Sequence, residues 1–512
     1  MKRRIAAFLL CVVMLLTLFG CGKDSSVNED NSGIGQSMYE GDGISLACNA
    51  NDSFDPYKAA TKLNRLICTL LYDTIVKIDN QYNAVNVLAE SVALEKEKCT
   101  VKLKSVTFSD GALLTADDVI YSFNLAKNSQ NFSANLSSII LATKNDEKTI
   151  VFTSDKQDAY AANLLTFPII KKESDLLVDG DNVNLPPIGS GRYVINPDLS
   201  GLTANGKYHL GEPKIKNVKL INTPDQEALS HAIEIGAVDM YYTDLSDCNI
   251  LRMSGTRVNT VLNNLVYIGI NLNNSVLKNN YMRHGLSAAL NREKICEDTY
   301  YTNAVPATGV FNPAWQGIKG IQSIQTTNKN EISIENFRKI GYNIKNNEGF
   351  LLNANNHVVE LRLLVNRENA FRNSAAELIS SQLAAVGIKI KIESVPYSQY
   401  VSRLKAGQFD LYLAEINIKE NMDLTELLCS GGTAAYGIPK VIDDGDGANG
   451  ISLQQAINGF YKGENTVSDI ASMAVSELSI IPVCYRTGIL FCSNEIKEPS
   501  VNFTADIYGI LG

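Results

Sequence analysis

The sequence has 512 residues, of which 45% are hydrophobic and 20% are charged, and its formal net charge is −9. These values are typical of a soluble globular protein, and the length predicts more than one lobe. The 55 acidic residues outnumber the 46 lysines and arginines, and no basic stripe is present. Phosphate backbones require such a stripe, so nucleic acid is excluded as a partner, and we interpret the acidic balance as favouring solubility.

The N-terminus has the pattern of an export signal. Basic residues at positions 2–4 precede an apolar run at 5–19, which is short for a membrane span and typical of a signal peptide. The run ends in Gly20 and Cys21. A small residue directly before a cysteine resembles a bacterial lipobox, in which Cys21 would be lipidated and become the first mature residue. The alternatives are an uncleaved anchor and an ordinary signal peptide.

We therefore expect a signal peptide at 1–20 and a lipidated, flexible tether at 21–40. The tether is rich in Ser, Asn, Gly and Asp and has few apolar residues, so it cannot bury a core. Two acyl chains on Cys21 would be enough for stable anchoring, because a single chain binds membranes only marginally.

The folded part is expected to begin with a strand at 44–48 and a helix at 62–72. Thr115 is a good helix N-cap, and Asp118, three residues later, can complete a capping box. These two residues predict a helix over 116–127. The chain is then expected to continue with a strand at 149–153, a short helix at 160–165 and a tight glycine turn at 189–191.

Two later segments share one design, in which a helix with one apolar face ends at a glycine and a strand follows. These are a helix at 226–235, Gly236 and a strand at 238–242, and a helix at 397–406, Gly407 and a strand at 409–413. Both glycines are placed for a left-handed C-cap. Further elements are expected as a helix at 375–386 and strands at 266–271, 388–392 and 480–485. This alternation predicts α/β lobes with helix-covered sheets.

The sequence contains no recognisable constellation of catalytic or metal-binding residues. The histidines, which are His209, His231, His284 and His357, are not at metal-ligand spacing, and no nucleophile elbow is evident. The cysteines beyond Cys21 form no CxxC pair, so we expect buried free thiols, with one or two disulfides as the alternative. We therefore expect no enzyme activity and no resident cofactor, and binding remains as the function.

Three motifs occur in order early in the folded part: DP at 55–56, LAES at 88–91 and FSDGALLTADDVIYS at 108–122. Their order resembles the extracellular solute-binding proteins, family 5, of bacterial oligopeptide and dipeptide ABC importers. The segments PIGSGRY at 187–193 and RHGLSAALNR at 283–292 are similar to later motifs of that family, and the resemblance implies a helix for the second of them. The resemblance implies an α/β fold of the two-lobed, periplasmic-binding-protein-like type II (Venus-flytrap) class with an extra inserted domain.

The resemblance also implies a division into domains. A discontinuous lobe I would combine 41–60, 170–264 and 482–512, an inserted domain II would occupy 61–169, and lobe III would span 265–481. The connecting strands near 265–272 and 481–485 would then act as the hinge between the lobes.

Two ligand-lining segments are carried over from the family, one at the start of the first helix and one directly after the strand at 409–413. In peptide-binding members the second segment holds an Asp that binds the ligand's N-terminal ammonium, and Ile418 stands there in this sequence. Glu415, Glu420 or Asp423 are candidates to replace that charge, and Glu415 has Lys62 as a competing partner. Trp315 either faces the cleft, as the resemblance implies, or packs in the core. The expected ligand-binding residues are Ala60, Thr61, Lys62, Trp315, Glu415, Ile416 and Asn417.

The function implied by the resemblance is that of a lipid-anchored substrate-binding protein of an ABC importer. It would capture an oligopeptide or similar small solute between its lobes and deliver it to the permease and its ATPases. We expect a monomer at the extracytoplasmic face of a bacterial membrane. The alternatives are a receptor for a signalling peptide or a nickel chelate and, in a different class, an extracytoplasmic hydrolase.

Overall fold

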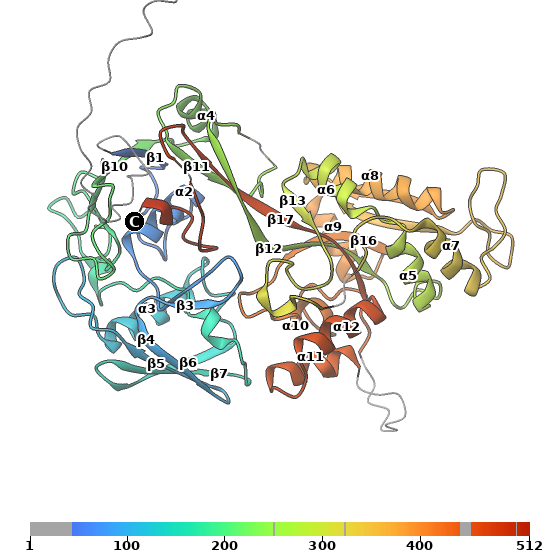
Figure 1. The fold of residues 1–512 in the computed structure, drawn as a ribbon, viewed down its shortest axis with the longest axis horizontal. Helices are drawn as coiled ribbons and strands as arrows, with labels where there is room; N and C mark the ends of the chain where they lie inside the picture. Colours follow the sequence, from blue (N-terminus) through green and yellow to red (C-terminus); the bar gives the residue numbers. More distant parts are fainter. Residues whose placement is uncertain (1–42, 249–250, 322–323, 441–451, 498, 512) are drawn as a thin grey trace, which may run out of the picture. The chain divides into compact units, whose positions relative to one another are not determined.

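The computed structural model describes residues 43–511, apart from 249–250, 322–323, 441–451 and 498 (Figure 1). These described residues belong to one compact unit. The expected signal peptide, Cys21 and the tether at 21–40 lie outside the described residues.

The largest element is a mixed sheet of eleven strands (Figure 1). Its order is β15-β14-β16-β12-β17-β11-β1-β10-β9-β8, and β13 pairs with β17 in addition. The strands are β1 (Ile44–Cys48), β8 (Tyr193–Ile195), β9 (Gly201–Ala204), β10 (Asn217–Asn222), β11 (Met240–Thr243), β12 (Thr256–Ile270), β13 (Ala304–Pro306), β14 (Glu360–Asn366), β15 (Lys389–Val395), β16 (Leu411–Asn417) and β17 (Ile480–Cys492).

Strands β12 and β17 lie at the centre of this sheet and are its longest members, with 15 and 13 residues. They pair antiparallel in three stretches, because the register shifts between Val261 and Leu265 and again between Val266 and Tyr267 of β12. On one side β17 also pairs with β11, and on the other side β12 pairs with β16. The strands expected at 266–271 and 480–485 are therefore confirmed as strands, and both elements are longer than predicted.

A smaller antiparallel sheet has the order β4-β5-β7-β6 and is formed by β4 (Ala89–Glu95), β5 (Lys98–Leu103), β6 (Ile139–Asp146) and β7 (Thr149–Ser154). Strands β2 (Val76–Ile78) and β3 (Ala84–Asn86) form a separate pair. Helix α3 (Ala116–Asn128) contacts this sheet, and its capping box between Thr115 and Asp118 is present as predicted. Phe123 of α3 packs edge-on against Phe152 of β7, with ring centroids 5.5 Å apart.

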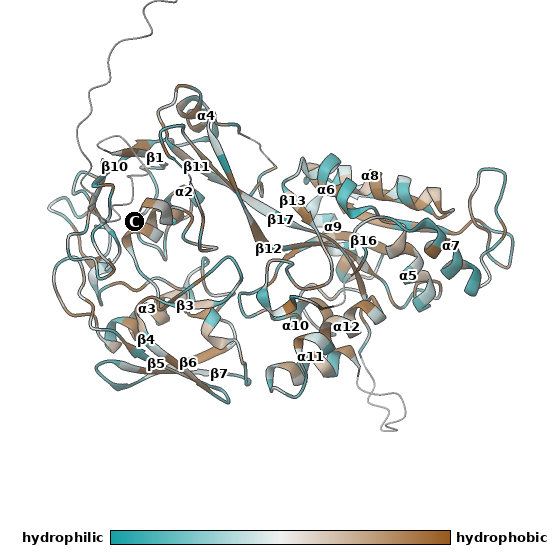
Figure 2. Cartoon of the chain, in the orientation of Figure 1, coloured by the Kyte–Doolittle hydropathy of each residue, from teal (hydrophilic) through white to brown (hydrophobic). Residues whose placement is uncertain are grey.

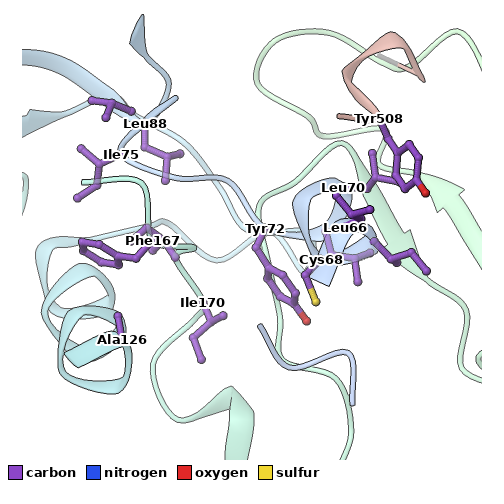
Figure 3. Packing of buried hydrophobic residues seen from close by; sticks show 14 of the residues in the cluster. Leu66, Cys68, Leu70, Tyr72, Ile75, Leu88, Ala126, Phe167, Ile170 and Tyr508 are labelled. Carbon is purple, nitrogen blue, oxygen red and sulfur yellow. The ribbon is translucent and has the colours of Figure 1, made fainter. Parts of the chain in front are cut away.

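Helix α2 (Lys62–Leu71) fills the core next to β1, because its apolar residues lie on one face (Figure 3). Leu66, Cys68 and Leu70 of this helix are buried in the same cluster as Tyr508 near the C-terminus. The C-terminal segment thus closes over an N-terminal helix.

The twin helix–glycine–strand design is confirmed. Helix α4 (Gln226–Glu234) is followed by Gly236 with φ 68°, and α9 (Tyr397–Lys405) by Gly407 with φ 65°. The other helices are α5 (Asn280–Ala288), α6 (Arg292–Tyr300), α7 (Asn330–Lys339), α8 (Ala370–Ala385), α10 (Thr425–Leu428), α11 (Leu453–Tyr461) and α12 (Val467–Glu477), with 3₁₀ turns at Ala161–Leu164, Ser174–Leu176, Gln316–Ile318 and Gly509–Leu511. Figure 2 shows α7 as largely hydrophilic, and only Ser333 and Phe337 of this helix are buried.

Two local predictions differ from the structure. The segment 283–292 resembles a single helix of the family but here joins two helices, because Asn291 caps the start of α6 by accepting from the Lys294 backbone N–H. The strand expected at 409–413 is β16, which begins at Leu411 and continues to Asn417. Glu415, Ile416 and Asn417 therefore lie within the strand and do not follow it.

Within the described residues the cysteines are all free in this structure. Seven of them are buried and Cys248 is half-buried.

Candidate functional site

A cavity of about 490 Å³ lies against the centre of the eleven-stranded sheet. Its walls come from β12, β16 and β17, from the C-terminal end of α6, from α8 and α9, and from the loops after β11 and α10. Elements far apart in the sequence thus converge on one concave site. Two of the seven expected ligand-binding residues, Glu415 and Asn417, line this cavity.

One carboxylate oxygen of Glu415 has three polar contacts, two with Arg486 and one with Asn264. Its Oε1 accepts a hydrogen bond of 2.8 Å from Arg486 Nε and another of 2.8 Å from Asn264 Nδ2, and it lies 2.7 Å from Arg486 Nη2. The Arg486 side chain is only 7% exposed and that of Glu415 is 15% exposed. Burial acts to lower the pKa of Arg486, but the Glu415 carboxylate outweighs burial and the pKa is raised. The guanidinium therefore stays charged and paired.

The irregularity in β12 brings these groups together. Val261 and Leu265 pair with Thr487 and Tyr485 of β17, so three residues of β12 lie opposite the single residue Arg486 and form a bulge. Bulges re-aim side chains and bend a strand. Asn264, within this bulge, reaches Glu415 with its Nδ2 and accepts from Asn417 Nδ2 at 3.0 Å with its Oδ1.

Lys62 is connected to Arg486 through Asp244. Its ammonium forms an ion pair with Asp244 and a hydrogen bond of 3.0 Å with Ser246 Oγ, while Arg486 Nη1 donates to the backbone oxygen of Asp244. Burial acts to raise the pKa of Asp244, but Lys62 outweighs it and the pKa is lowered. Lys62 and Glu415 are thus linked through Asp244 and Arg486, and each has another charged partner in this structure.

A second cavity of about 260 Å³ adjoins Lys62. Thr61 and Lys62 line it, and Ser246 lines both this cavity and the larger one. Ala60 lines neither of these two cavities, and its backbone N–H binds the Asp52 carboxylate. The first predicted segment therefore contributes two of its three residues to a cavity wall.

Trp315 and Ile416 do not line the larger cavity. The Trp315 side chain is buried, at 3% exposure, and packs against Phe311 and Tyr160 with ring centroids 5.1 and 5.7 Å apart. Ile416 is half-buried against the same hydrophobic cluster. The contacts of Trp315 correspond to the core-packing alternative considered for it.

Aromatic side chains form much of the wall of the larger cavity, and one cation stands among them. The aromatic residues are Tyr267, Tyr300, Phe371, Tyr397, Tyr400, Tyr412 and Tyr436. Arg372 of α8 also lines the cavity, and no hydrogen bond or ion pair of its side chain occurs within the described part of the chain. Its Nε and the Tyr300 hydroxyl are buried without partners. The site thus contains a compensated Glu415–Arg486 pair and an uncompensated guanidinium.

Arg372 and Arg486 were not among the residues expected from the sequence. Arg486 had a signal, since it is a lone charge in the apolar run 480–492, and buried charges are rare unless they are paired. Arg372 had none, because an arginine near the start of a helix is ordinarily solvated.

A second polar cluster joins residues 156–163 to the loop after β16. Lys156 forms an ion pair of 3.2 Å with Asp423, and Asn421 Nδ2 donates to Asp158 at 2.7 Å. In the same loop the Oε2 atom of Glu420 is buried without a hydrogen-bond partner, and burial raises the pKa of Glu420 to about 7. A titratable group therefore lies at this junction.

Within the residues that the structure describes, no group of three His, Cys, Asp or Glu side chains is placed to hold a metal ion. In the same part of the chain, no helix combines the length and apolar character that a membrane crossing requires.

The fold and the cavity define an α/β protein of the two-lobed periplasmic-binding class. Residues 83–432 match the family of bacterial extracellular solute-binding proteins, family 5 (middle region), which is most of the chain. The chain belongs to this family. It is therefore a substrate-binding component of the ABC transport type and not an enzyme.

The chain is also similar to individual proteins. The oligopeptide-binding protein AppA of Bacillus subtilis (strain 168) is 25% identical over 437 residues, which cover 80% of each chain. The glutathione-binding protein GsiB of Shigella flexneri is 23% identical over 373 residues, 69% of each chain.

Among solved structures, the nickel ABC transporter protein from Bacillus halodurans has a TM-score of 0.74 at 18% identity, covering 91% of this chain and 98% of that one. The structure of Bacillus subtilis AppA with a nonapeptide has a TM-score of 0.58 at 20% identity, covering 91% of this chain and 97% of that one. At these identities the likeness supports the fold alone.

Proposed function

We propose that this protein is the lipid-anchored receptor of an ABC importer and captures a peptide or peptide-like solute that carries a carboxylate. The observation that carries the ligand class is the uncompensated Arg372 in a cavity of about 490 Å³ lined by tyrosines. Cavities of this size suit small molecules, and aromatic walls supply apolar area with few, specific polar contacts. An arginine fork matches the geometry of a carboxylate.

The Glu415–Arg486 ion pair limits which ligand charges the cavity favours. Because Arg486 already neutralises Glu415, the carboxylate does not need a cationic ligand for charge balance. A ligand amine could still approach the second carboxylate oxygen of Glu415. An anion near Arg372 would meet one carboxylate from the cavity wall, that of Glu415, which Arg486 already neutralises. The charges therefore favour an acidic or zwitterionic solute.

The proposed mechanism is closure around the ligand. Lobe I, domain II and lobe III would follow the division expected from the sequence, with β12 and β17 as the connecting strands. The separate four-stranded sheet formed between Ala89 and Ser154 supports an inserted domain within 61–169. A ligand with contacts on both lobes shifts the open–closed equilibrium only by its preference for the closed state.

Mass spectrometry of the solute that co-purifies with the protein tests the ligand class. We expect a molecule with at least one carboxylate, and its affinity for Arg372→Met should fall by roughly 10- to 100-fold, since hydrogen bonds to charged groups contribute about 1.5–3 kcal/mol. Arg367→Met is the matched control, because Arg367 is exposed and does not line the cavity. A co-purified solute without an anionic group, or equal affinities of both variants, would contradict the assignment.

The anchor is tested separately. Cys21→Ser should abolish lipidation and release the protein from the membrane or leave it unprocessed. Full processing with unchanged membrane retention of that variant would exclude the lipobox.

A further inference from the structure

One loop of the cavity wall is held by two tyrosine hydroxyls. The loop comprises residues 429–438, directly after α10. Its residues that line the cavity are Thr433, Ala434 and Tyr436. Tyr267 on β12 and Tyr412 on β16 both donate from their hydroxyls to the Ala434 backbone oxygen, at 3.3 and 2.9 Å. Both tyrosines are buried, so one carbonyl of the loop is fixed to two neighbouring strands of the central sheet.

The position of the Tyr412 ring follows from the register of the sheet. Tyr412 pairs with Gly269 of β12. A Cβ atom at position 269 would lie 1.9 Å from the Tyr412 ring, so the ring fills the space that any side chain there would need. The rings of Tyr267 and Tyr412 also meet edge-on, with centroids 5.9 Å apart. Glycine at position 269 thus allows the Tyr412 ring to lie over β12, with its hydroxyl at the loop.

The loop has two further attachments. The Thr433 and Ala434 N–H groups both donate to Glu426 of α10, to its Oε2 atom at 2.8 Å and its backbone oxygen at 3.0 Å respectively. Near the other end of the loop, the Gly437 oxygen accepts from the Leu272 N–H at 3.0 Å, just beyond β12. The loop is therefore attached to α10 and to the end of β12, and the two tyrosine hydroxyls add an attachment to the interior of the sheet.

We propose that Tyr267 and Tyr412 are positioning residues that hold the loop 429–438 as a fixed wall of the cavity, and that this wall restricts the solute to short peptides or peptide-like acids. The proposal rests on the proposed function, because it takes this cavity as the binding site. A volume of about 490 Å³ equals that of a cube with an edge of roughly 8 Å, whereas an extended chain advances about 3.3 Å per residue. The cavity bounded by this loop therefore accommodates about two or three residues.

The two hydroxyls can be removed without removing the rings. Phenylalanine at both positions keeps the aromatic packing, but the Ala434 carbonyl loses both of its side-chain donors. The loop should then gain freedom while the strands stay in place. A movable wall admits longer solutes, and short solutes bind less well because they must order the loop.

Hydrogen exchange tests the positioning role on the full-length protein, freed of solute by dialysis. We expect the amides of 430–438 to exchange about tenfold faster in the double variant Tyr267→Phe/Tyr412→Phe than in the wild type. Tyr400→Phe is the matched control, because Tyr400 is buried in the same cavity wall but donates to the Leu413 oxygen of β16, at 2.9 Å. This control should leave the exchange of the loop unchanged.

Two results of the exchange experiment would overturn the positioning role. One is a wild-type rate for the loop in the double variant, and the other is equal acceleration in Tyr400→Phe. If the double variant does not fold, Tyr412→Phe alone removes the shorter of the two hydrogen bonds, and the same expectations apply to it.

Solute length gives a second measurement, which a purely structural role would not change. Random-sequence pools of dipeptides, tripeptides and hexapeptides with free termini are added separately, and the Tm is recorded. The two short pools should raise the Tm of the wild type by at least about 2 °C, and the hexapeptide pool should not. In the double variant the shift with hexapeptides should increase and the shift with the short pools should decrease.

Equal shifts of the wild type with short and long pools, or an unchanged length preference in the double variant, would overturn the restriction on solute length. If no pool binds but the loop exchanges as expected, the peptide class of the proposed function is wrong and the positioning role is supported. The exchange experiment contains no solute, so failure of the positioning role is distinguishable from failure of the proposed function.

Discussion

The side chains of Glu415 and Arg486 form an ion pair across β12, the strand that lies between β16 and β17. Glu415 is on β16 and Arg486 on β17, and both strands pair with β12. The contact exists where β12 bulges, and it consists of a 2.8 Å hydrogen bond from Nε and a 2.7 Å approach of Nη2 to the same carboxylate oxygen. The pair therefore couples three central strands at the wall of the cavity.

A double-mutant cycle measures this coupling. Glu415→Gln and Arg486→Met should each lower the free energy of unfolding by roughly 3 kcal/mol, because each leaves a buried charge without its partner. The double variant should lose less than the sum by about 1–3 kcal/mol. Urea denaturation of the four proteins provides the values. The exposed pair Glu335–Lys339 is the control, and its coupling should not exceed about 0.5 kcal/mol. Additive losses at Glu415 and Arg486 would show that the pair is not energetically coupled.

Glu420 should make stability depend on pH near neutrality. Its folded-state pKa of about 7 lies above its ordinary value of 4.5, because of burial. The folded state therefore holds a proton that the unfolded state releases, and this stabilisation is complete below pH 4.5 and lost as the pH rises through 7.

Glu420→Gln removes this titration. At pH 8 the variant should be more stable than the wild type by about 2–3 kcal/mol, and near pH 4.5 the two proteins should converge. Denaturant unfolding at both pH values checks this. An identical difference at the two pH values would show that the Glu420 proton is not linked to folding.

Asp506 should anchor the C-terminal segment. Its carboxylate is 3% exposed, lies 2.6 Å from Lys77 Nζ and also binds Arg192. Burial acts to raise its pKa, but the two cations outweigh it and the pKa is lowered. The contribution of the Asp506 carboxylate to the free energy of unfolding is therefore present above pH 3.8, its ordinary pKa. This contribution is lost as the pH falls through the folded-state pKa.

Asp506→Asn should reduce the free energy of unfolding at pH 7 by roughly 3–5 kcal/mol, because two buried cations lose their counter-charge. The deficit should shrink in strong acid, where the wild type is also protonated. Glu212→Gln, in an exposed ion pair with Lys216, is the control and should change stability by at most about 1 kcal/mol. A deficit that does not vary with pH would argue against the charge explanation.

Trp315 is the sole tryptophan, and its contacts predict a role in stability and not in binding. Trp315→Phe should lower the free energy of unfolding by about 1–2 kcal/mol through lost packing. Its Kd for the co-purified solute should stay within about twofold of the wild type, which corresponds to about 0.4 kcal/mol. Titration calorimetry gives the Kd. Unchanged stability with a Kd weakened about tenfold would instead place Trp315 in the binding site.

Local sequence signals correctly predicted those helix ends whose capping residues lie close together in the sequence. The capping box of Thr115 and Asp118 and the glycines after α4 and α9 each act within one helical turn, so they can be recognised without tertiary information. The alternation of helices and strands predicted α/β lobes, and the family resemblance then supplied the two-lobed class, which no local pattern contains.

The binding site could be predicted only in part, because its charges are paired through tertiary contacts. Arg486 is 71 residues from Glu415, and neither residue type indicates the other. The end of β16 was misplaced for a related reason: Glu and Asn have low strand propensity, yet pairing with β12 keeps Glu415 and Asn417 extended. Arg372 remained undetected because what distinguishes it is the lack of a partner in the described structure.

Met240 of β11 pairs with Leu46 on one side and with Cys492 on the other. This part of the sheet is thus assembled from the beginning, the middle and the end of the folded chain. During synthesis or export, β1 has no complete sheet to join until the last strand has emerged. Contacts of such high sequence separation slow folding and leave strand edges exposed in the meantime. The chain is therefore expected to remain a target for chaperones until its final residues are released, and C-terminal truncation should be more harmful than the small size of the lost segment would indicate.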